Sequence, residues 1–373
     1  MAEAVVDIDV GTQPFDLAFH PSASLVAVSL ITGRLHLYEY GDGRQPERKW
    51  NVSAHSESCR AVRFTGDGRL LLTGSPDCSI VATDVETGQA VARLTGAHGA
   101  AINRIINATD WSIASGDDEG TIKVWDTRQN VCCSSFKAHD DFVADMEFVP
   151  DSMQLLGASG DGTLSICNIR RNRVDGKSQF AEDELLSVVM CKDGRKVVCG
   201  SQDGVLLLYS WGHMLDCSDR FIGHPNSVDA LLKVDEDTLL TGSMDGIIRV
   251  VTILPNKMIG VIGEHAEYPI ERLAFSHDKT TLGSASHDNT VKLWDVKYLQ
   301  EGDDEASEGV DTKQQASLGE NTGSQGNGQT DSTIISGDDS DDEMEAEGSR
   351  RRKKKGKQPA LPSKGKSKFF EDL

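Results

Sequence analysis

The sequence predicts an all-β fold: a closed β-propeller of seven blades, completed by an N-terminal strand and followed by a disordered C-terminal tail. Three observations lead to this prediction. A pattern recurs with a period close to 42 residues along the first 296 residues, and such a period is typical of a four-stranded propeller blade. Each repeat contains short alternating runs separated by Gly, Asp, Asn and Pro, as antiparallel strands require. Near residue 300 this pattern stops and the composition becomes polar.

The repeat is marked by an acidic residue in a tight turn, which recurs at intervals of 42, 42, 42, 42 and 43 residues. These turn acids are Asp77, Glu119, Asp161, Asp203, Asp245 and Asp288. Two residues earlier a serine stands at positions 75, 159, 201, 243 and 286. The units open with His55, His98, His139, His224 and His265, and the fifth unit lacks its histidine. A weaker first unit over residues 15–40 brings the number of blades to seven.

The strands of the last unit follow from its alternating runs, residues 271–276, 280–286 and 290–296. These make only three strands, and the alternating segment 4–10 has no other partner. We therefore expect this segment to pair with the last unit, which would close the ring and leave no open gap between blades.

Polar stretches at residues 170–184 and 212–222 are expected to be surface connections between blades. The propeller is predicted to span residues 1–299. Residues 300–373 form the tail, whose acidic, Gly-, Ser- and Gln-rich first part cannot bury enough apolar surface to offset its ordering entropy, so we expect it to be disordered.

Composition excludes several classes of function. The formal net charge of −21 argues against a general grip on nucleic acid or membranes, because their phosphates would repel the protein. No signal peptide is predicted, and no run approaches the roughly 18 apolar residues of a membrane span. The eight cysteines lack C-x-x-C spacing, so we predict no zinc site and mostly buried thiols in a reducing compartment. We predict no metal, cofactor or small-molecule site.

The stretch SGDDEGTIKVWDTR at residues 115–128 is the sharpest copy of the repeat. With the opening histidines and the turn acids, it resembles the WD-repeat β-propeller family over residues 1–296. The resemblance implies a structural hydrogen-bonded relay in each blade, from turn Asp to His, from His to Ser, and from Ser to Trp. The seventh unit has the full set, which consists of His265, Ser286, Asp288 and Trp294.

The other units depart from this set. The third unit combines His98 and Trp125 with acids at positions 117 and 119, where Ser and Asp are usual. The second, fourth and sixth units replace the tryptophan, so we expect their blades to be less firmly held. The replacements are Thr83, Cys167 and Val251. The same residue types occur in hydrolases, but a nucleophile would occur once, whereas these residues recur at blade spacing. We therefore predict no catalytic residue.

Arg128 ends the Trp125-Asp126-Thr127-Arg128 sequence. This sequence resembles the extended WD box, in which Arg follows Trp-Asp by two residues. The resemblance implies that Arg128, Asp126 and Trp125 bind damaged-DNA-binding protein 1, the adaptor of cullin-4 ubiquitin ligases. An arginine offers a planar, permanently charged fork to carboxylates and is favoured at interfaces. The alternative is an ordinary exposed arginine paired with a nearby acid.

More specific stretches resemble the WD repeat-containing protein 55 family, particularly its plant members. These stretches are ESCRAVRF (57–64), DCSIVATDVETG (77–88), AEDELLSVV (181–189), PNSVDALLK (225–233) and the terminal FFEDL. The resemblance implies a nuclear or nucleolar protein linked to ribosomal RNA synthesis and processing. Plant members of the family are also implicated as receptors in cullin-4 ligases that act in growth, reproductive and embryo development.

A basic cluster in the tail fits a nuclear import signal. It consists of Arg350, Arg351, Arg352, Lys353, Lys354, Lys355 and Lys357. The alternative is a solubilising tail, and contact with RNA is less favoured because no aromatic residues are interleaved with the basic ones. We expect a nuclear protein, with the nucleolus as a second site and a share in the cytoplasm.

Two functional hypotheses remain. In the first, the protein is a monomeric, non-enzymatic scaffold that docks on the ligase adaptor through Arg128 and holds an unidentified client. In the second, it is a nucleolar factor in ribosome biogenesis that associates with pre-ribosomal particles and never meets a ligase. Propeller faces recognise partners by surface shape, so the sequence does not name the client.

Overall fold

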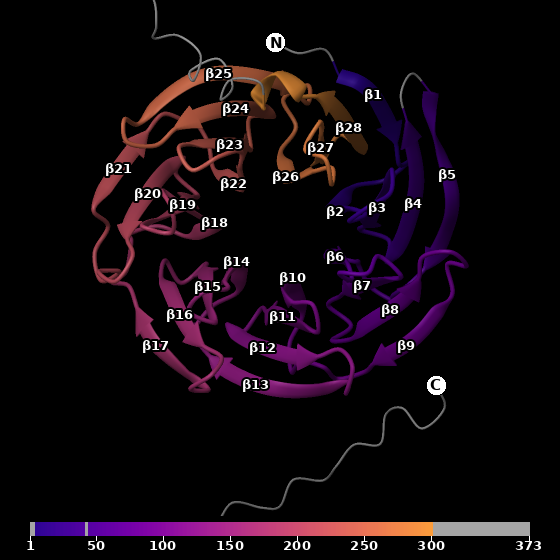
Figure 1. Cartoon of the computed structure of the whole chain (residues 1–373), viewed down its shortest axis with the longest axis horizontal. Coiled ribbons are helices and arrows are strands. Elements are labelled where there is room, and N and C mark those ends of the chain that lie inside the picture. Colours follow the sequence, from indigo (N-terminus) through magenta and orange to yellow (C-terminus); the bar gives the residue numbers. More distant parts are fainter. Residues whose placement is uncertain (1–3, 42–43, 301–373) are drawn as a thin grey trace, which may run out of the picture. The chain divides into compact units, whose positions relative to one another are not determined.

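The computed structural model describes residues 4–41 and 44–300 of the 373-residue chain. In these ranges 28 strands form seven four-stranded antiparallel sheets, arranged as blades in a ring (Figure 1). One 3₁₀ turn, η1 (Lys297–Leu299), follows the last strand. The predicted all-β, seven-bladed propeller is confirmed. The predicted tail, with its basic cluster, lies outside the described residues.

In the first three blades, four consecutive strands pair in chain order, from the innermost to the outermost (Figure 1). Blade 1 consists of β2 (Pro14–Phe19), β3 (Leu25–Leu30), β4 (Arg34–Gly41) and β5 (Arg44–Ser53). Blade 2 consists of β6 (Ala61–Phe64), β7 (Leu70–Gly74), β8 (Ile80–Asp84) and β9 (Ala90–Leu94). Blade 3 consists of β10 (Ile102–Thr109), β11 (Ser112–Asp117), β12 (Thr121–Asp126) and β13 (Val131–Lys137).

The next three blades repeat this arrangement. Blade 4 consists of β14 (Val143–Val149), β15 (Gln154–Ser159), β16 (Leu164–Asn168) and β17 (Arg173–Lys177). Blade 5 consists of β18 (Leu185–Cys191), β19 (Lys196–Ser201), β20 (Val205–Ser210) and β21 (Asp219–Ile222). Blade 6 consists of β22 (Val228–Lys233), β23 (Thr238–Ser243), β24 (Ile247–Thr252) and β25 (Lys257–Glu264).

Blade 7 joins the two ends of the propeller. It consists of β26 (Ile270–Phe275), β27 (Thr281–Ser286), β28 (Thr290–Asp295) and, outermost, β1 (Ala4–Asp9). Strand β1 pairs antiparallel with β28, with Val6 opposite Leu293 and Ile8 opposite Val291. Ile8 is buried against apolar side chains of blades 1 and 7. The predicted closure by the N-terminal strand is therefore confirmed.

Two outer strands correct the sequence-based prediction. Residues 170–184 and 212–222, which we expected to be connections only, contain β17 and β21. The fourth strand of a blade has one neighbour and a largely solvated position, so it needs little apolar patterning. Strand β17, for example, has no fully buried residue.

The hydrophobic core lies between neighbouring blades. One cluster combines Leu72 and Ile80 of blade 2 with Ile102, Ile105 and Trp125 of blade 3. Each Å² of apolar area that such contacts remove from water stabilises the fold by about 25 cal/mol. Because each blade covers only its neighbours, the closed ring is needed to bury both faces of all of them.

Buried carboxylates also connect adjacent blades. Six of the seven inner strands carry a register shift near their start, as β2 does between Pro14 and Asp16. Such a bulge changes the direction of a side chain. Asp16 accepts a hydrogen bond of 3.0 Å from the Val62 amide of blade 2. Asp145 accepts one of 3.2 Å from the Val188 amide of blade 5.

Among the described residues, no helix is long and apolar enough to cross a membrane. Four cysteines are buried, which are Cys59, Cys167, Cys191 and Cys199. Cys132 and Cys133 are exposed and the remaining two are half-buried. The expectation that most cysteines are buried therefore applies to half of them.

Candidate functional site

Blade 3 contains a complete relay built on Ser115. The Trp125 indole Nε1 donates to Ser115 Oγ at 2.8 Å, and His98 Nε2 lies 2.6 Å from the same oxygen. His98 Nδ1 lies 2.7 Å from a carboxylate oxygen of Asp117. Asp117 thus takes the role that we expected of the turn acid, while Glu119 takes no part. The prediction that only the seventh unit has a full set is wrong.

Blade 7 has the second complete relay. His265 Nε2 lies 2.6 Å from Ser284 Oγ, the Trp294 Nε1 donates to Ser284 at 2.8 Å, and His265 Nδ1 lies 2.8 Å from Asp288. Burial raises the pKa of Asp288, but hydrogen bonds from His265 and Thr290 outweigh it and lower the pKa to about 2. The turn carboxylate is therefore held in its charged form.

The relay serine of blade 7 is Ser284, and the assignment of Ser286 to this position is corrected. Ser286 Oγ instead donates to the Tyr268 carbonyl at 3.3 Å and accepts from the Asp288 amide at 3.4 Å. Ser286 therefore belongs to the tight-turn network of the same blade. Both serines lie on β27 and point to the same face, so only the position of the histidine decides between them.

The remaining relays are incomplete. In blade 2, His55 Nε2 lies 2.9 Å from the Thr73 hydroxyl, while the hydroxyl of Thr83 has no hydrogen-bond partner among the described residues. In blade 4, Gly157 stands at the relay position, and within the same described ranges His139 Nε2 has no hydrogen-bond partner. The tryptophan-bonded hydroxyls of blades 3 and 7 are completely buried. They cannot reach a substrate, so the relays stabilise blades and are not catalytic sites.

The residues predicted to bind the ligase adaptor occupy different environments. Trp125 is buried in the relay, so it cannot contact a partner. Asp126 is half-buried and accepts hydrogen bonds from the amides of Arg128 and Gln129 at 2.8 and 3.0 Å. The Arg128 side chain is 57% exposed, and its Nη2 lies 3.2 Å from Asp126. Of the three, Arg128 is the residue that a partner can reach.

Trp111 is a neighbour that the sequence did not single out. The Arg128 guanidinium lies over its indole ring, 5.1 Å from the centroid. Trp111 is 55% exposed and lies in the turn between β10 and β11. Its only signal in the sequence is a tryptophan in a turn, where small and polar residues are usual.

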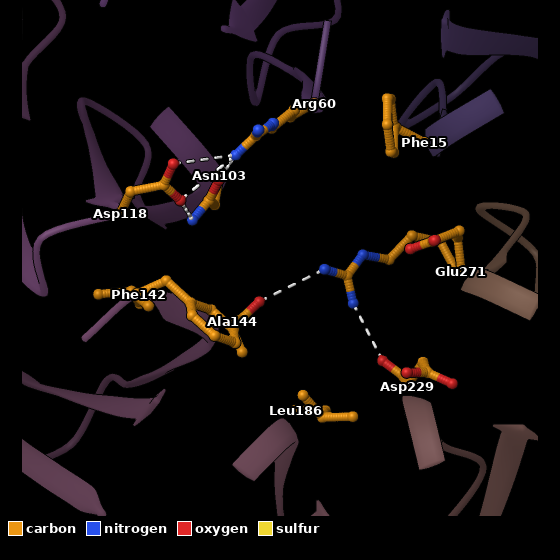
Figure 2. A pocket seen from close by; sticks show the side chains of 11 residues that line it. Phe15, Arg60, Asn103, Asp118, Phe142, Ala144, Leu186, Asp229 and Glu271 are labelled. Atoms are coloured by element: carbon orange, nitrogen blue, oxygen red, sulfur yellow. Dashed lines mark hydrogen bonds and ion pairs between the residues drawn. The ribbon is translucent and has the colours of Figure 1, made fainter. Parts of the chain in front are cut away.

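A pocket of about 350 Å³ lies at the centre of the ring, where residues from the inner edge of all seven blades meet (Figure 2). One wall is a satisfied polar cluster, in which Arg60 and Asn103 both bond the Asp118 carboxylate. Phe15, Phe142 and Leu186 form apolar parts of the lining.

Arg272, on β26 of blade 7, is one of the residues that line this pocket. Its guanidinium donates to the main-chain carbonyls of Asp229 at 3.2 Å and Ala144 at 3.4 Å (Figure 2). Burial and the charge of Arg104 lower the pKa of Arg272. Because Arg272 links blade 7 to blades 6 and 4, it holds the two sides of the pocket together.

Asp229 is a carboxyl group of the pocket with a single hydrogen bond in the described part of the chain. Ser227 donates to it at 2.9 Å, and no other hydrogen bond to the carboxyl group is present among the described residues. Burial, with the nearby charge of Glu271, raises the pKa of Asp229 to about 6. Glu271 itself is paired with His287, and this hydrogen bond raises the pKa of His287.

Carboxyl, guanidinium and amide groups are the polar side-chain groups that line the pocket. Its lining residues include no Ser, Thr, Cys or Lys that could act as a nucleophile. Within residues 4–41 and 44–300, no group of three or more His, Cys, Asp or Glu is arranged to hold a metal ion. The predicted import cluster, Arg350 to Lys357, lies beyond these residues.

The ring of four-stranded blades, with His, Ser and Trp bonded beside an acidic turn, defines the class of WD-repeat β-propeller proteins. These proteins are scaffolds for protein–protein interactions. A family model described as WDR55 matches residues 5–299. The chain therefore belongs to the WD repeat-containing protein 55 family.

Relatives from plants, animals and fungi agree with this membership. WD repeat-containing protein 55 of Arabidopsis thaliana is 57% identical over 298 residues, which cover 80% of this chain and 84% of the relative. The Homo sapiens protein of the same name is 40% identical over 296 residues, or 79% of this chain and 77% of the relative. WD repeat-containing protein JIP5 of Coprinopsis cinerea is 36% identical over 304 residues, which cover 78% and 74% of the two chains.

Proposed function

We propose that this protein is a non-enzymatic scaffold that docks on damaged-DNA-binding protein 1, the adaptor of cullin-4 ubiquitin ligases, and presents a client for ubiquitylation. The observation that supports it is the state of Arg128. Its side chain is 57% exposed, yet it is held by the Asp126 carboxylate at 3.2 Å and by the Trp111 ring. A side chain that is ordered before binding loses less entropy when a partner arrives.

The corresponding residue of the next blade provides a matched control. Arg170 follows Cys167-Asn168 at the same spacing and is also exposed. Its turn lacks the Trp-Asp sequence, and no aromatic ring lies under its guanidinium among the described residues. A general electrostatic attraction would involve both arginines, whereas a specific dock requires Arg128 alone.

Co-precipitation of purified adaptor with the full chain tests the proposal. We expect Arg128→Ala to leave only a small residual capture and Arg170→Ala to leave capture intact, with an unchanged melting temperature for both variants. We expect Arg128→Lys to bind weakly, because lysine keeps the charge but loses the planar fork. Undiminished binding by Arg128→Ala would remove the ligase proposal.

The nuclear site of action is part of the proposal. The basic cluster at 350–357 supports a nuclear location. The proposal also includes the developmental role that the family resemblance implies. Replacing the seven basic residues of this cluster with Gln should shift a fluorescent fusion from the nucleus to the cytoplasm. A wholly nuclear variant would remove the cluster as the import signal.

The second candidate is a nucleolar factor in ribosome biogenesis, which is supported by the same family membership. Depletion of the protein separates the two candidates. Accumulation of precursor ribosomal RNA that Arg128→Ala rescues fully would favour the second candidate, because rescue would then not need the adaptor.

A further inference from the structure

We propose that Trp111 is a second anchor of the docking surface around Arg128. The partner would place a carboxylate on the Arg128 guanidinium and an apolar surface on the exposed indole. This inference rests on the adaptor proposal above, since it concerns the same partner. It adds a contact that the Trp-Asp-x-Arg motif does not contain.

Two turns of blade 3 bring Trp111 and Arg128 together. The Thr127 amide and hydroxyl both donate to the main-chain carbonyl of Trp111, at 2.9 and 3.0 Å. The β10–β11 turn is thereby tied to the β12–β13 turn, and the indole is fixed beneath Arg128. The surface exists before any partner binds, so its geometry is preorganised.

Blade construction does not explain a tryptophan at this position. The corresponding turns of the other six blades contain no Trp, Phe or Tyr. These turns are residues 20–24, 65–69, 150–153, 192–195, 234–237 and 276–280. Trp111 belongs to none of the seven apolar clusters between blades, whereas Trp125 and Trp294 do.

Exposure of this indole is unfavourable for the isolated protein, because its apolar area stays in water. The contact with Arg128 offsets only part of this, since a cation–π pair at an exposed site contributes little. A partner that covers the ring would remove the rest of this free-energy cost. Tryptophan and arginine are the residue types most enriched among interface hot spots.

The free edge of the guanidinium defines what the partner must offer. Arg128 uses Nη2 for Asp126 and one face for the indole, while no hydrogen bond of Nε or Nη1 is present among the described residues. Nη2 carries two hydrogens, one on the edge that it shares with Nε and one on the edge that it shares with Nη1. Asp126 occupies one of these edges, so a carboxylate can accept two parallel hydrogen bonds from the other. Val131, which is 43% exposed and pairs with Asp126 across the strands, extends the apolar part.

Binding of purified damaged-DNA-binding protein 1 to the immobilised full chain measures both residues. We expect Trp111→Ala to raise the Kd roughly 30-fold, as for a hot-spot residue. Trp111→Phe should recover part of this, because a phenyl ring still fits under the guanidinium. Phe180→Ala, which removes an aromatic ring that is 66% exposed and lies after β17, is the matched control and should bind normally. Urea midpoints should be unchanged in all variants.

A double variant separates direct contact from mere positioning of Arg128. If Trp111 touches the partner, Trp111→Ala should weaken binding further in the Arg128→Ala background. No additional loss there would overturn the anchor, and so would normal binding by Trp111→Ala alone. A wild-type chain that does not bind, or an Arg128→Ala variant that binds normally, would instead overturn the adaptor proposal and the inference with it.

Discussion

The indole of Trp125 and the hydroxyl of Ser115 are joined by a hydrogen bond of 2.8 Å inside blade 3. The same oxygen bonds His98, so one hydroxyl satisfies two buried rings. Ser284 has the same role in blade 7. Ser115 and Ser284 are therefore the positions at which the structure departs from the relay that the sequence predicts.

Removal of a relay hydroxyl should destabilise the propeller. We expect Ser115→Ala and Ser284→Ala to lower the free energy of unfolding by about 1–3 kcal/mol each, because a buried Trp N–H and a His nitrogen lose their partner. Urea unfolding measures this. Ser286→Ala is the control and should cost less, since it removes only bonds of 3.3 and 3.4 Å. A larger cost at 286 than at 284 would contradict the corrected assignment.

Restoring a serine to the relay of blade 4 should fail. A Cβ on Gly157 would lie 2.7 Å from Ile122 Cδ1 and 2.9 Å from Ser165 Oγ. We expect Gly157→Ser to cost about 1–3 kcal/mol through overpacking, although it supplies the missing hydroxyl to His139. Thermal unfolding checks this. Combining it with Ile122→Val removes the clashing methyl group and should recover much of the loss; an additive double variant would exclude this clash as the cause.

Asp229 should reduce stability at neutral pH. Its folded-state pKa of about 6 is above the ordinary 3.8, so its contribution is most favourable below pH 4 and is lost as the pH rises through 6. We expect Asp229→Asn, which resembles the neutral acid, to raise the unfolding free energy by about 3 kcal/mol at pH 7.5, since one pKa unit corresponds to ~1.4 kcal/mol. The gain should vanish near pH 4. Urea unfolding at both pH values measures it, and a pH-independent gain would contradict the titration of Asp229.

The contribution of Asp145 to stability depends on pH in the opposite direction to that of Asp229. Burial raises its pKa, but the charges of Arg104 and Arg272 outweigh this and hold the pKa below its usual range. Its stabilising effect is therefore present above the ordinary pKa and is lost as the pH falls through the folded value.

We expect Asp145→Asn to cost about 3–5 kcal/mol at neutral pH, because among the described residues Arg104 then keeps a single ion pair, with Asp16 at 3.8 Å. Asp193→Asn breaks the exposed pair with Arg195 and should cost under about 1 kcal/mol. Urea unfolding measures both losses of unfolding free energy. Equal losses for the two variants would show that burial does not increase the contribution of the Asp145–Arg104 pair to stability.

The predictions that the structure confirms depend on order along the chain. The acidic turn recurs at a nearly constant interval, and strands alternate with a period of two residues, so the seven blades could be counted from the sequence. The closing strand followed by elimination, because segment 4–10 had no partner in any complete unit. Outer strands β17 and β21 were missed, since a strand with one neighbour has little apolar pattern to detect.

The Arg128 surface and the relays depend on contacts between segments that are distant in the sequence. The sequence predicted fewer of these contacts than of the strands and blades. It placed Arg128 after Trp-Asp, but it could not show that Trp125 is buried while Trp111 lies under the guanidinium. It also could not choose between Ser284 and Ser286, which share one face of β27. That choice depends on where His265 arrives from the preceding loop.

Repeat number, blade order and ring closure were thus determined by the sequence alone, because they arise from local periodicity and from the pairing of successive strands. The central pocket was decided only by the tertiary structure. There Arg272 meets the carbonyl of Ala144, from which 128 positions separate it in the chain. The repeat places both residues near the start of an inner strand, but it does not show that their two blades lie opposite each other. Closing the ring brings the inner edges of opposite blades face to face, and the side chains that then meet are set by the whole ring.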